Sequence, residues 1–133
     1  MSSGYKIRNQ SGIHFLSFAV VEWVDVFTRR AYCEIIVDRL NHCIQKKGLV
    51  VYAWVIMSNH LHLIVSAKDD NLSDVLRDFK KFTAREIIKS INNDNIGSRK
   101  NWMLWLFRSA GAKNKRNKDY QFTDSNRYRL APG

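Results

Sequence analysis

Residues 49–67 read LVVYAWVIM-SN-HLHLIVSA, two apolar runs that are separated only by Ser58 and Asn59. Both runs are rich in β-branched and aromatic side chains, which favour strands over helices at this length. A two-residue connection that contains a turn-prone asparagine is typical of a β-hairpin. The segment therefore predicts two antiparallel strands, residues 49–57 and 60–67.

The sequence on either side of this hairpin predicts the elements that it packs against. Residues 13–21 (IHFLSFAVV) predict a strand. Residues 29–47 predict a helix with Thr28 as its N-cap and a glycine closing it. A second helix is expected from a cap at Asn71 or Ser73 to about residue 92, with a basic side opposite its apolar side.

A third helix is expected over residues 98–110 and is ended by Gly111. Its segment WMLWLF, residues 102–107, is apolar all round, so we expect a buried core or a subunit interface to cover it, in preference to base stacking by its tryptophans. A short strand is expected at residues 120–123. This order predicts one α+β domain over residues 1–133, with a ferredoxin-like split βαβ fold and an antiparallel sheet that carries helices on one face.

The composition indicates a folded, basic protein. The 133 residues are 45% hydrophobic and carry a formal charge of +10. Residues 77–133 hold 14 basic and 5 acidic side chains, whereas residues 1–76 hold 8 basic and 7 acidic side chains. A polyanion is the expected partner. No apolar run approaches the ~18 residues of a membrane span, and the N-terminus has no signal-peptide pattern, so we expect a cytoplasmic protein without membrane contact.

His60 and His62 stand two residues apart at the start of the second hairpin strand. Alternate side chains of a strand leave the same face, roughly 6.5–7 Å apart along the chain, so two imidazoles can bind one ion or one phosphate. Leu61 and Leu63 would then point the other way, into the core. Spacing alone leaves two interpretations open, a metal site or a pair of surface histidines.

The segment MSNHLHLIV, residues 57–65, resembles the histidine-hydrophobic-histidine signature of the single-tyrosine transposases. This family includes the REP-associated tyrosine transposases and small insertion-sequence enzymes, and its motif commonly reads M-P-N-H-x-H-L, with Ser58 here in place of the proline. The similarity covers roughly residues 5–122 and includes GIHFLSF (12–18), YAWV (52–55) and LSDVLRDFKKFT (72–83).

The resemblance implies a transposase domain that binds single-stranded or hairpin DNA and forms a homodimer. In such enzymes the paired histidines, here His60 and His62, hold Mg²⁺ or Mn²⁺ against the scissile phosphate while a tyrosine hydroxyl attacks the phosphorus. The products are a 5′-phosphotyrosine link and a free 3′-OH. A cation suits this chemistry because it neutralises charge that develops on the phosphate.

The family's nucleophile usually lies on a helix after the last strand, in a segment resembling Y-x-x-x-N-P-x-x-A. This sequence contains no such segment, so the resemblance assigns no catalytic tyrosine. Tyr120 and Tyr128 are the nucleophile candidates near the C-terminus. Their simpler interpretations are a strand residue for Tyr120 and a residue of a basic, flexible end for Tyr128.

Basic side chains at helical spacing indicate a surface that follows a DNA backbone, with a solvated helix face as the alternative. The predicted DNA-binding residues are Arg77, Lys80, Lys81, Arg85 and Lys89 in the second helix, and Lys113, Lys115 and Arg116 after the third.

Three other functions fit parts of the pattern. The first is a remnant that holds DNA hairpins without cutting them. The second is an RNA-binding βαββαβ domain of the RRM type, which would stack bases on aromatic side chains of its central strands. The third is a replication-initiator or relaxase nuclease with the same paired histidines.

Overall fold

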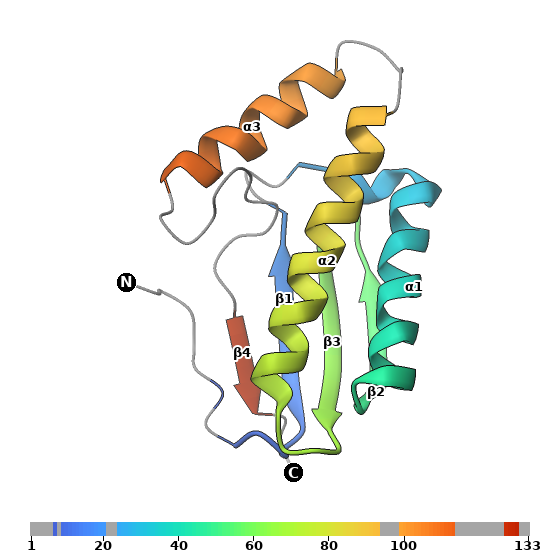
Figure 1. Cartoon of the computed structure of the whole chain (residues 1–133), viewed down its shortest axis with the longest axis vertical. Coiled ribbons are helices and arrows are strands. Elements are labelled where there is room, and N and C mark those ends of the chain that lie inside the picture. Colours follow the sequence, from blue (N-terminus) through green and yellow to red (C-terminus); the bar gives the residue numbers. More distant parts are fainter. Residues whose placement is uncertain (1–6, 8, 21–23, 94–98, 114–126, 131–133) are drawn as a thin grey trace.

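The structure of the chain is a computed structural model that describes residues 7, 9–20, 24–93, 99–113 and 127–130. Its elements are β1 (His14–Ala19), the short 3-10 turn η2 (Val26–Thr28), α1 (Arg30–Lys46), β2 (Leu49–Ile56), β3 (His60–Ala67), α2 (Leu72–Asn93), α3 (Arg99–Lys113) and β4 (Arg127–Leu130) (Figure 1). Within the described ranges, no helix combines the length and the apolar character that a membrane crossing requires.

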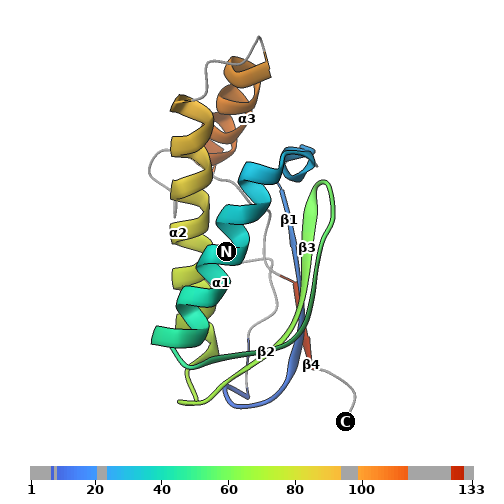
Figure 2. The same cartoon turned by 90° about the vertical axis from the view of Figure 1, so that its right-hand side faces the viewer.

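The strands form one antiparallel sheet in the spatial order β2-β3-β1-β4. β3 lies between β1 and β2 and runs opposite to both, so α1 connects two parallel strands that are not neighbours. This is the split βαβ arrangement, and the predicted ferredoxin-like α+β fold is confirmed. α1 and α2 cover one face of the sheet (Figure 2).

Alternation along the strands gives the sheet a core face and an open face. On β3, Leu61 and Leu63 point toward the helices and are 2% and 0% exposed. On β1, Leu16 and Phe18 point the same way, while Phe15 lies on the open face. Burial of such side chains stabilises the fold by roughly 1.5–3 kcal/mol each. The helices complete the core with Tyr32, Ile36, Leu40, Cys43, Val75, Leu76, Phe79 and Ile87.

The N-cap of α1 is Arg29, and the prediction of Thr28 is wrong. Thr28 ends η2 instead, and its hydroxyl donates a hydrogen bond to the carbonyl oxygen of Asp25 at 2.9 Å. The helix ends at Lys46, one residue before its predicted end, and the predicted closing glycine is confirmed. Gly48 follows it with a φ of +75°, a left-handed conformation that glycine adopts without strain.

The first turn of α2 is capped from a distant part of the chain. The backbone N–H of Ser73 donates to Gln10 Oε1 at 2.8 Å, and Gln10 Nε2 donates to Ser73 Oγ at 2.9 Å. Asn71 precedes the helix as expected, but its side-chain oxygen is buried and has no hydrogen-bond partner among the described residues. Gln10 therefore replaces the local side-chain cap that the sequence predicts.

α3 departs most from the prediction. It continues past Gly111 for two residues, so the predicted end is wrong. Its apolar segment is not covered on all sides either, because Trp102 and Trp105 are 47% and 62% exposed while Met103 and Phe107 are buried. The physical reason is that α3 packs with one side only, chiefly against α2 (Figure 1).

The predicted strand at residues 120–123 lies outside the described residues. The fourth strand of the sheet is β4, which pairs antiparallel with β1 and places Tyr128 opposite Leu16. Tyr128 is therefore part of the sheet, and its interpretation as a residue of a flexible end is wrong.

Candidate functional site

The two histidines of β3 lie side by side on the open face of the sheet. The ring centroids of His60 and His62 are 4.6 Å apart, and the rings meet edge to face at 80°. Both side chains are partly buried. The two imidazoles therefore share one face of the sheet and lie in contact, as alternation along the strand predicts.

Two kinds of contact hold the pair in place. Leu61 and Leu63, which alternate with the histidines, anchor β3 in the core. The turn before His60 is tied to the chain after β1 and to η2, through a hydrogen bond from the Val20 N–H to the Asn59 carbonyl at 2.9 Å and one from the Phe27 N–H to the Ser58 carbonyl at 2.9 Å. The start of β3 is thus fixed from both sides.

Each imidazole has a distinct environment. His60 Nδ1 lies 2.7 Å from Asn59 Oδ1, and because an amide oxygen accepts, this nitrogen carries the hydrogen and the lone pair is on Nε2. His62 Nδ1 is buried and has no hydrogen-bond partner among the described residues. The His62 ring also packs against Phe15, with 5.4 Å between the centroids.

The surroundings of His60 favour its neutral form. Burial, and secondarily the charge on neighbouring His62, lower the pKa of the His60 imidazole below its ordinary value of 6.5. His60 therefore stays neutral at a lower pH than an ordinary histidine does. Neutral imidazole is the form that ligates a metal ion.

This donor set suits part of a metal site. Two imidazoles on one face, one of them with a buried nitrogen that has no partner among the described residues, can provide two nitrogen ligands to a divalent cation. Over the described ranges no group of three or more His, Cys, Asp or Glu side chains comes together. A cation here would therefore take its other ligands from water, from a bound phosphate or from parts of the chain beyond the described residues.

The sequence matches the family described as Transposase IS200 like over residues 14–107, which include both histidines. This chain belongs to the IS200-like transposase family. The chain also shares its fold with a candidate transposase from Deinococcus radiodurans R1, at a TM-score of 0.51 and 18% identity over 68% of each chain. It is similar to a REP-associated tyrosine transposase bound to a REP hairpin as well, at a TM-score of 0.55 and 15% identity, over 86% of this chain and 75% of the other. No curated protein matches the sequence significantly.

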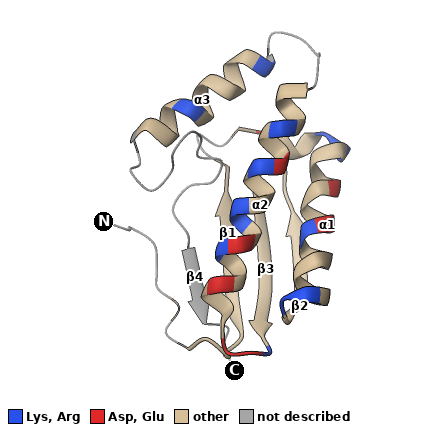
Figure 3. Ribbon diagram, in the orientation of Figure 1, with Lys and Arg blue, Asp and Glu red and all other residues tan. Residues whose placement is uncertain are grey.

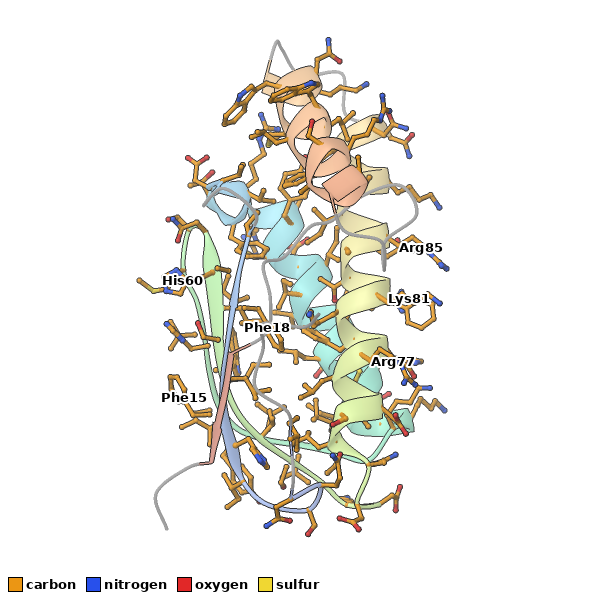
Figure 4. All side chains as sticks on the ribbon, turned by 90° about the vertical axis from the view of Figure 1, so that its left-hand side faces the viewer. Phe15, Phe18, His60, Arg77, Lys81 and Arg85 are labelled. Carbon is orange, nitrogen blue, oxygen red and sulfur yellow. The ribbon has the colours of Figure 1, made fainter. Side chains whose placement is uncertain are left out.

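In this IS200-like transposase the basic side chains of α2 face away from the histidine pair. Figure 4 shows His60 on the open side of the sheet and Arg77, Lys81 and Arg85 on the outer side of α2, at the opposite surface of the molecule. Lys89 is also exposed. The structure therefore does not bring the predicted metal ligands and the predicted α2 contacts into one surface.

Contacts within the helix restrain part of the α2 set. The Arg77 guanidinium lies 3.3 Å from an oxygen of Asp74 and 4.0 Å from one of Asp78, and the Arg85 guanidinium lies over the Phe82 ring at 5.4 Å. Because Asp74 and Asp78 neutralise part of its charge, Arg77 adds less to the potential of this surface than its sequence position suggests.

Lys80 is the exception within the α2 set. Its side chain turns toward the sheet, with Nζ 5.7 Å from the centre of the Phe18 ring, and it lines a small cavity of about 20 Å³ with Leu61, Phe79 and Thr83. Burial lowers the pKa of Lys80 to about 8. Lys80 therefore does not share the outer surface with Arg77, Lys81 and Arg85.

The remaining predicted residues are placed only in part. Lys113 is the last residue of α3, whereas Lys115, Arg116 and Tyr120 lie outside the described residues. Tyr128 lies in β4, two strands away from β3. Asn59 orients His60 and is a site residue that the sequence pattern did not single out, although its place directly before the histidine in the turn is a usable signal.

Proposed function

We propose that this chain binds folded single-stranded DNA on the open face of its sheet and holds a phosphodiester beside His60 and His62 for cleavage and rejoining. The observation that carries the proposal is the paired imidazoles, 4.6 Å apart, with the buried His62 Nδ1 unsatisfied among the described residues. Family membership supports DNA as the substrate. The likeness to a REP-associated tyrosine transposase that is bound to a REP hairpin supports a hairpin as its form.

We propose Mg²⁺ or Mn²⁺ as the cofactor, held by His60 and His62. When bound, a divalent cation would supply positive charge to the scissile phosphate and orient it for in-line attack. The chain's own contribution is positional, because Asn59 fixes the tautomer of His60 and the leucines between the histidines hold the strand. The attacking group in the family is a tyrosine hydroxyl, and Tyr120 and Tyr128 remain the candidates here.

The experiment is a covalent-adduct assay. Labelled hairpin DNA with a single-stranded flank is incubated with the protein and Mn²⁺, denatured in SDS and separated on a gel. A labelled band at the mass of protein plus DNA is expected, and phenylalanine variants of Tyr120 and Tyr128 identify the nucleophile by its loss. Hairpin binding without an adduct would reduce the function to the non-catalytic alternative, and absence of hairpin binding would contradict the proposal.

One observation favours a second candidate, an RRM-type RNA-binding domain. Phe15 lies on the open face of a central strand with its ring beside His62, in the position where such domains stack bases. A competition experiment distinguishes the two candidates: unlabelled RNA of the same sequence competes with the labelled DNA hairpin for the protein. Stronger competition by RNA than by DNA would favour this candidate.

We propose that Arg77, Lys81 and Arg85 contact DNA backbone as a surface separate from the histidine face. Replacing all three by Gln should weaken the affinity for the hairpin. It should also make the plot of log affinity against log salt concentration less steep, by roughly 0.7–0.9 for each phosphate that these side chains neutralise in the wild type. The cleavage rate of bound DNA should not change, because these side chains point away from the histidines. Fluorescence anisotropy between about 50 and about 200 mM salt measures the slope.

A control variant removes the same charge elsewhere. Arg30, Lys46 and Lys68 are exposed outside α2, and their triple Gln variant should lower affinity only slightly. An equal decrease in affinity in both triple variants would show that net charge alone attracts DNA and that the α2 surface does not touch it.

We also propose that two copies associate, as the family resemblance implies. β2 forms one edge of the sheet, so its outer backbone groups have no partner strand among the described residues. Such an edge is a template for pairing with a second copy. Light scattering over a concentration series should give twice the 15.6 kDa mass of one chain, and the mass of a single chain throughout would contradict the proposal.

A further inference from the structure

α3 exposes two large aromatic side chains along one side. Trp102 and Trp105 are 47% and 62% exposed, while Met103 and Phe107 on the opposite side are buried. Arg108 follows Trp105 by three residues and is exposed as well, so all three side chains lie on the outer part of the helix. Exposed tryptophans in such a cluster indicate a binding surface, because indoles are otherwise largely buried.

The charge of α3 indicates what this surface binds. The helix contains four basic residues and no acidic one, as the absence of red on α3 in Figure 3 shows. The basic residues are Arg99, Lys100, Arg108 and Lys113. An apolar protein partner has no need of this charge, whereas single-stranded nucleic acid offers both phosphates for the cations and flat bases for the indoles.

The position of α3 relates this surface to the histidine pair. α3 lies at the same end of the molecule as the turn between β2 and β3, where His60 begins its strand (Figures 1 and 2). The outer surface of α2, in contrast, faces the opposite side from His60 (Figure 4). α3 therefore lies, together with η2 and the start of α1, at the end of the molecule where a DNA strand would leave the histidine face.

We infer that Trp102 and Trp105 stack on unpaired bases of the single strand that flanks the DNA hairpin, and that Arg108 contacts its backbone. This inference rests on the proposed function and adds the part of the substrate that α3 recognises. Stacking tolerates different bases because every base has a flat face, so these indoles should add affinity for a flank without selecting its sequence.

The test compares a hairpin that carries a single-stranded flank with the same hairpin without it. Fluorescence anisotropy gives the affinity of each DNA for the wild type and for a Trp102→Ala/Trp105→Ala variant. The variant should bind the flanked hairpin about tenfold or more weakly and the bare hairpin as the wild type does. A Trp102→Phe/Trp105→Phe variant keeps aromatic rings at both positions and should retain most of the affinity.

Trp54→Ala is the matched control. Trp54 is 51% exposed on β2, so the substitution removes an indole of similar exposure from outside α3, and flank affinity should not change. Because β2 is also the proposed pairing edge, light scattering of this variant checks that self-association is kept. Quenching of the indole emission by the flank provides a second readout, which should disappear in the alanine variant. Thermal melting checks that every variant is folded, which we expect because about half or more of each substituted side chain is exposed.

Three outcomes overturn the inference. The first is equal affinity of the wild type and the alanine variant for the flanked hairpin. The second is unchanged DNA binding with a loss of self-association in light scattering, which would make α3 a protein interface. The third is a wild type that binds no DNA, which removes the proposed function as well. If the flank alone binds through the indoles and the hairpin does not, the inference stands and the proposed hairpin substrate fails.

Discussion

Replacing His60 or His62 by Ala is expected to abolish Mn²⁺-dependent cleavage of hairpin DNA and to lower Mn²⁺ affinity at least about a hundredfold. Loss of a residue that only supports a ligand already lowers metal affinity ten- to a hundredfold, so loss of one of two imidazoles should exceed that. Both side chains lie on the open face, and the leucines that anchor the strand are unchanged, so hairpin binding should persist. Calorimetric titration with Mn²⁺ gives a measure of binding that does not depend on cleavage.

Two further variants serve as references for this experiment. His42 is exposed on α1, so His42→Ala should leave both metal affinity and cleavage unchanged. Asn59→Ala removes the side-chain partner of His60 Nδ1 and should weaken metal binding about tenfold. The metal assignment fails if both histidine variants bind Mn²⁺ like the wild type, and it fails equally if they unfold, because the histidines would then be structural.

Replacing Lys80 by Met is expected to raise the free energy of unfolding at pH 7 by about 2–3 kcal/mol. Burial lowers the pKa of Lys80 from 10.5 to about 8, so at neutral pH the fold holds a charged ammonium in surroundings that favour the neutral amine. Methionine keeps the length of the side chain and removes the charge. The difference between the two pKa values corresponds to about 3 kcal/mol as an upper figure.

The same shift determines the pH dependence. Between about pH 8 and 10.5 the unfolded chain carries a proton on Lys80 that the folded chain has lost, so the stability of the wild type should rise with pH across this window. Below about pH 8 both states are protonated, and this contribution to stability is absent. Urea unfolding at pH 7 and at pH 10 measures it. The Met variant should lack the rise, and an equal rise in both proteins would contradict the assignment.

Elements that depend on local sequence pattern lie close to their predicted positions. β3 begins at His60 and ends at Ala67 as predicted, and α2 ends within one residue of its predicted end at about residue 92. Errors fell where contacts between distant residues replace local ones. Gln10 caps α2 at Ser73 across the fold, and no local motif signals such a contact.

The other source of error was the orientation of each helix about its own axis relative to the rest of the fold. The spacing of basic residues in α2 predicts a charged stripe, and periodicity gives its position relative to the apolar residues of the same helix. It does not tell that Lys80 lies over Phe18 on the sheet side. Nor does it tell that an all-apolar segment in α3 leaves Trp102 and Trp105 exposed, because that depends on how much of the helix finds a partner.

The sequence alone determined that His60 and His62 share one face, since alternation along a strand is a property of the backbone itself. It likewise determined the order of the elements from the hairpin at residues 49–67 outward. Only the tertiary structure decided that α2 turns its cations away from that face and that α3 lies at the same end of the molecule as the turn before His60. Those arrangements depend on how separate elements pack together, and no single segment encodes its neighbours.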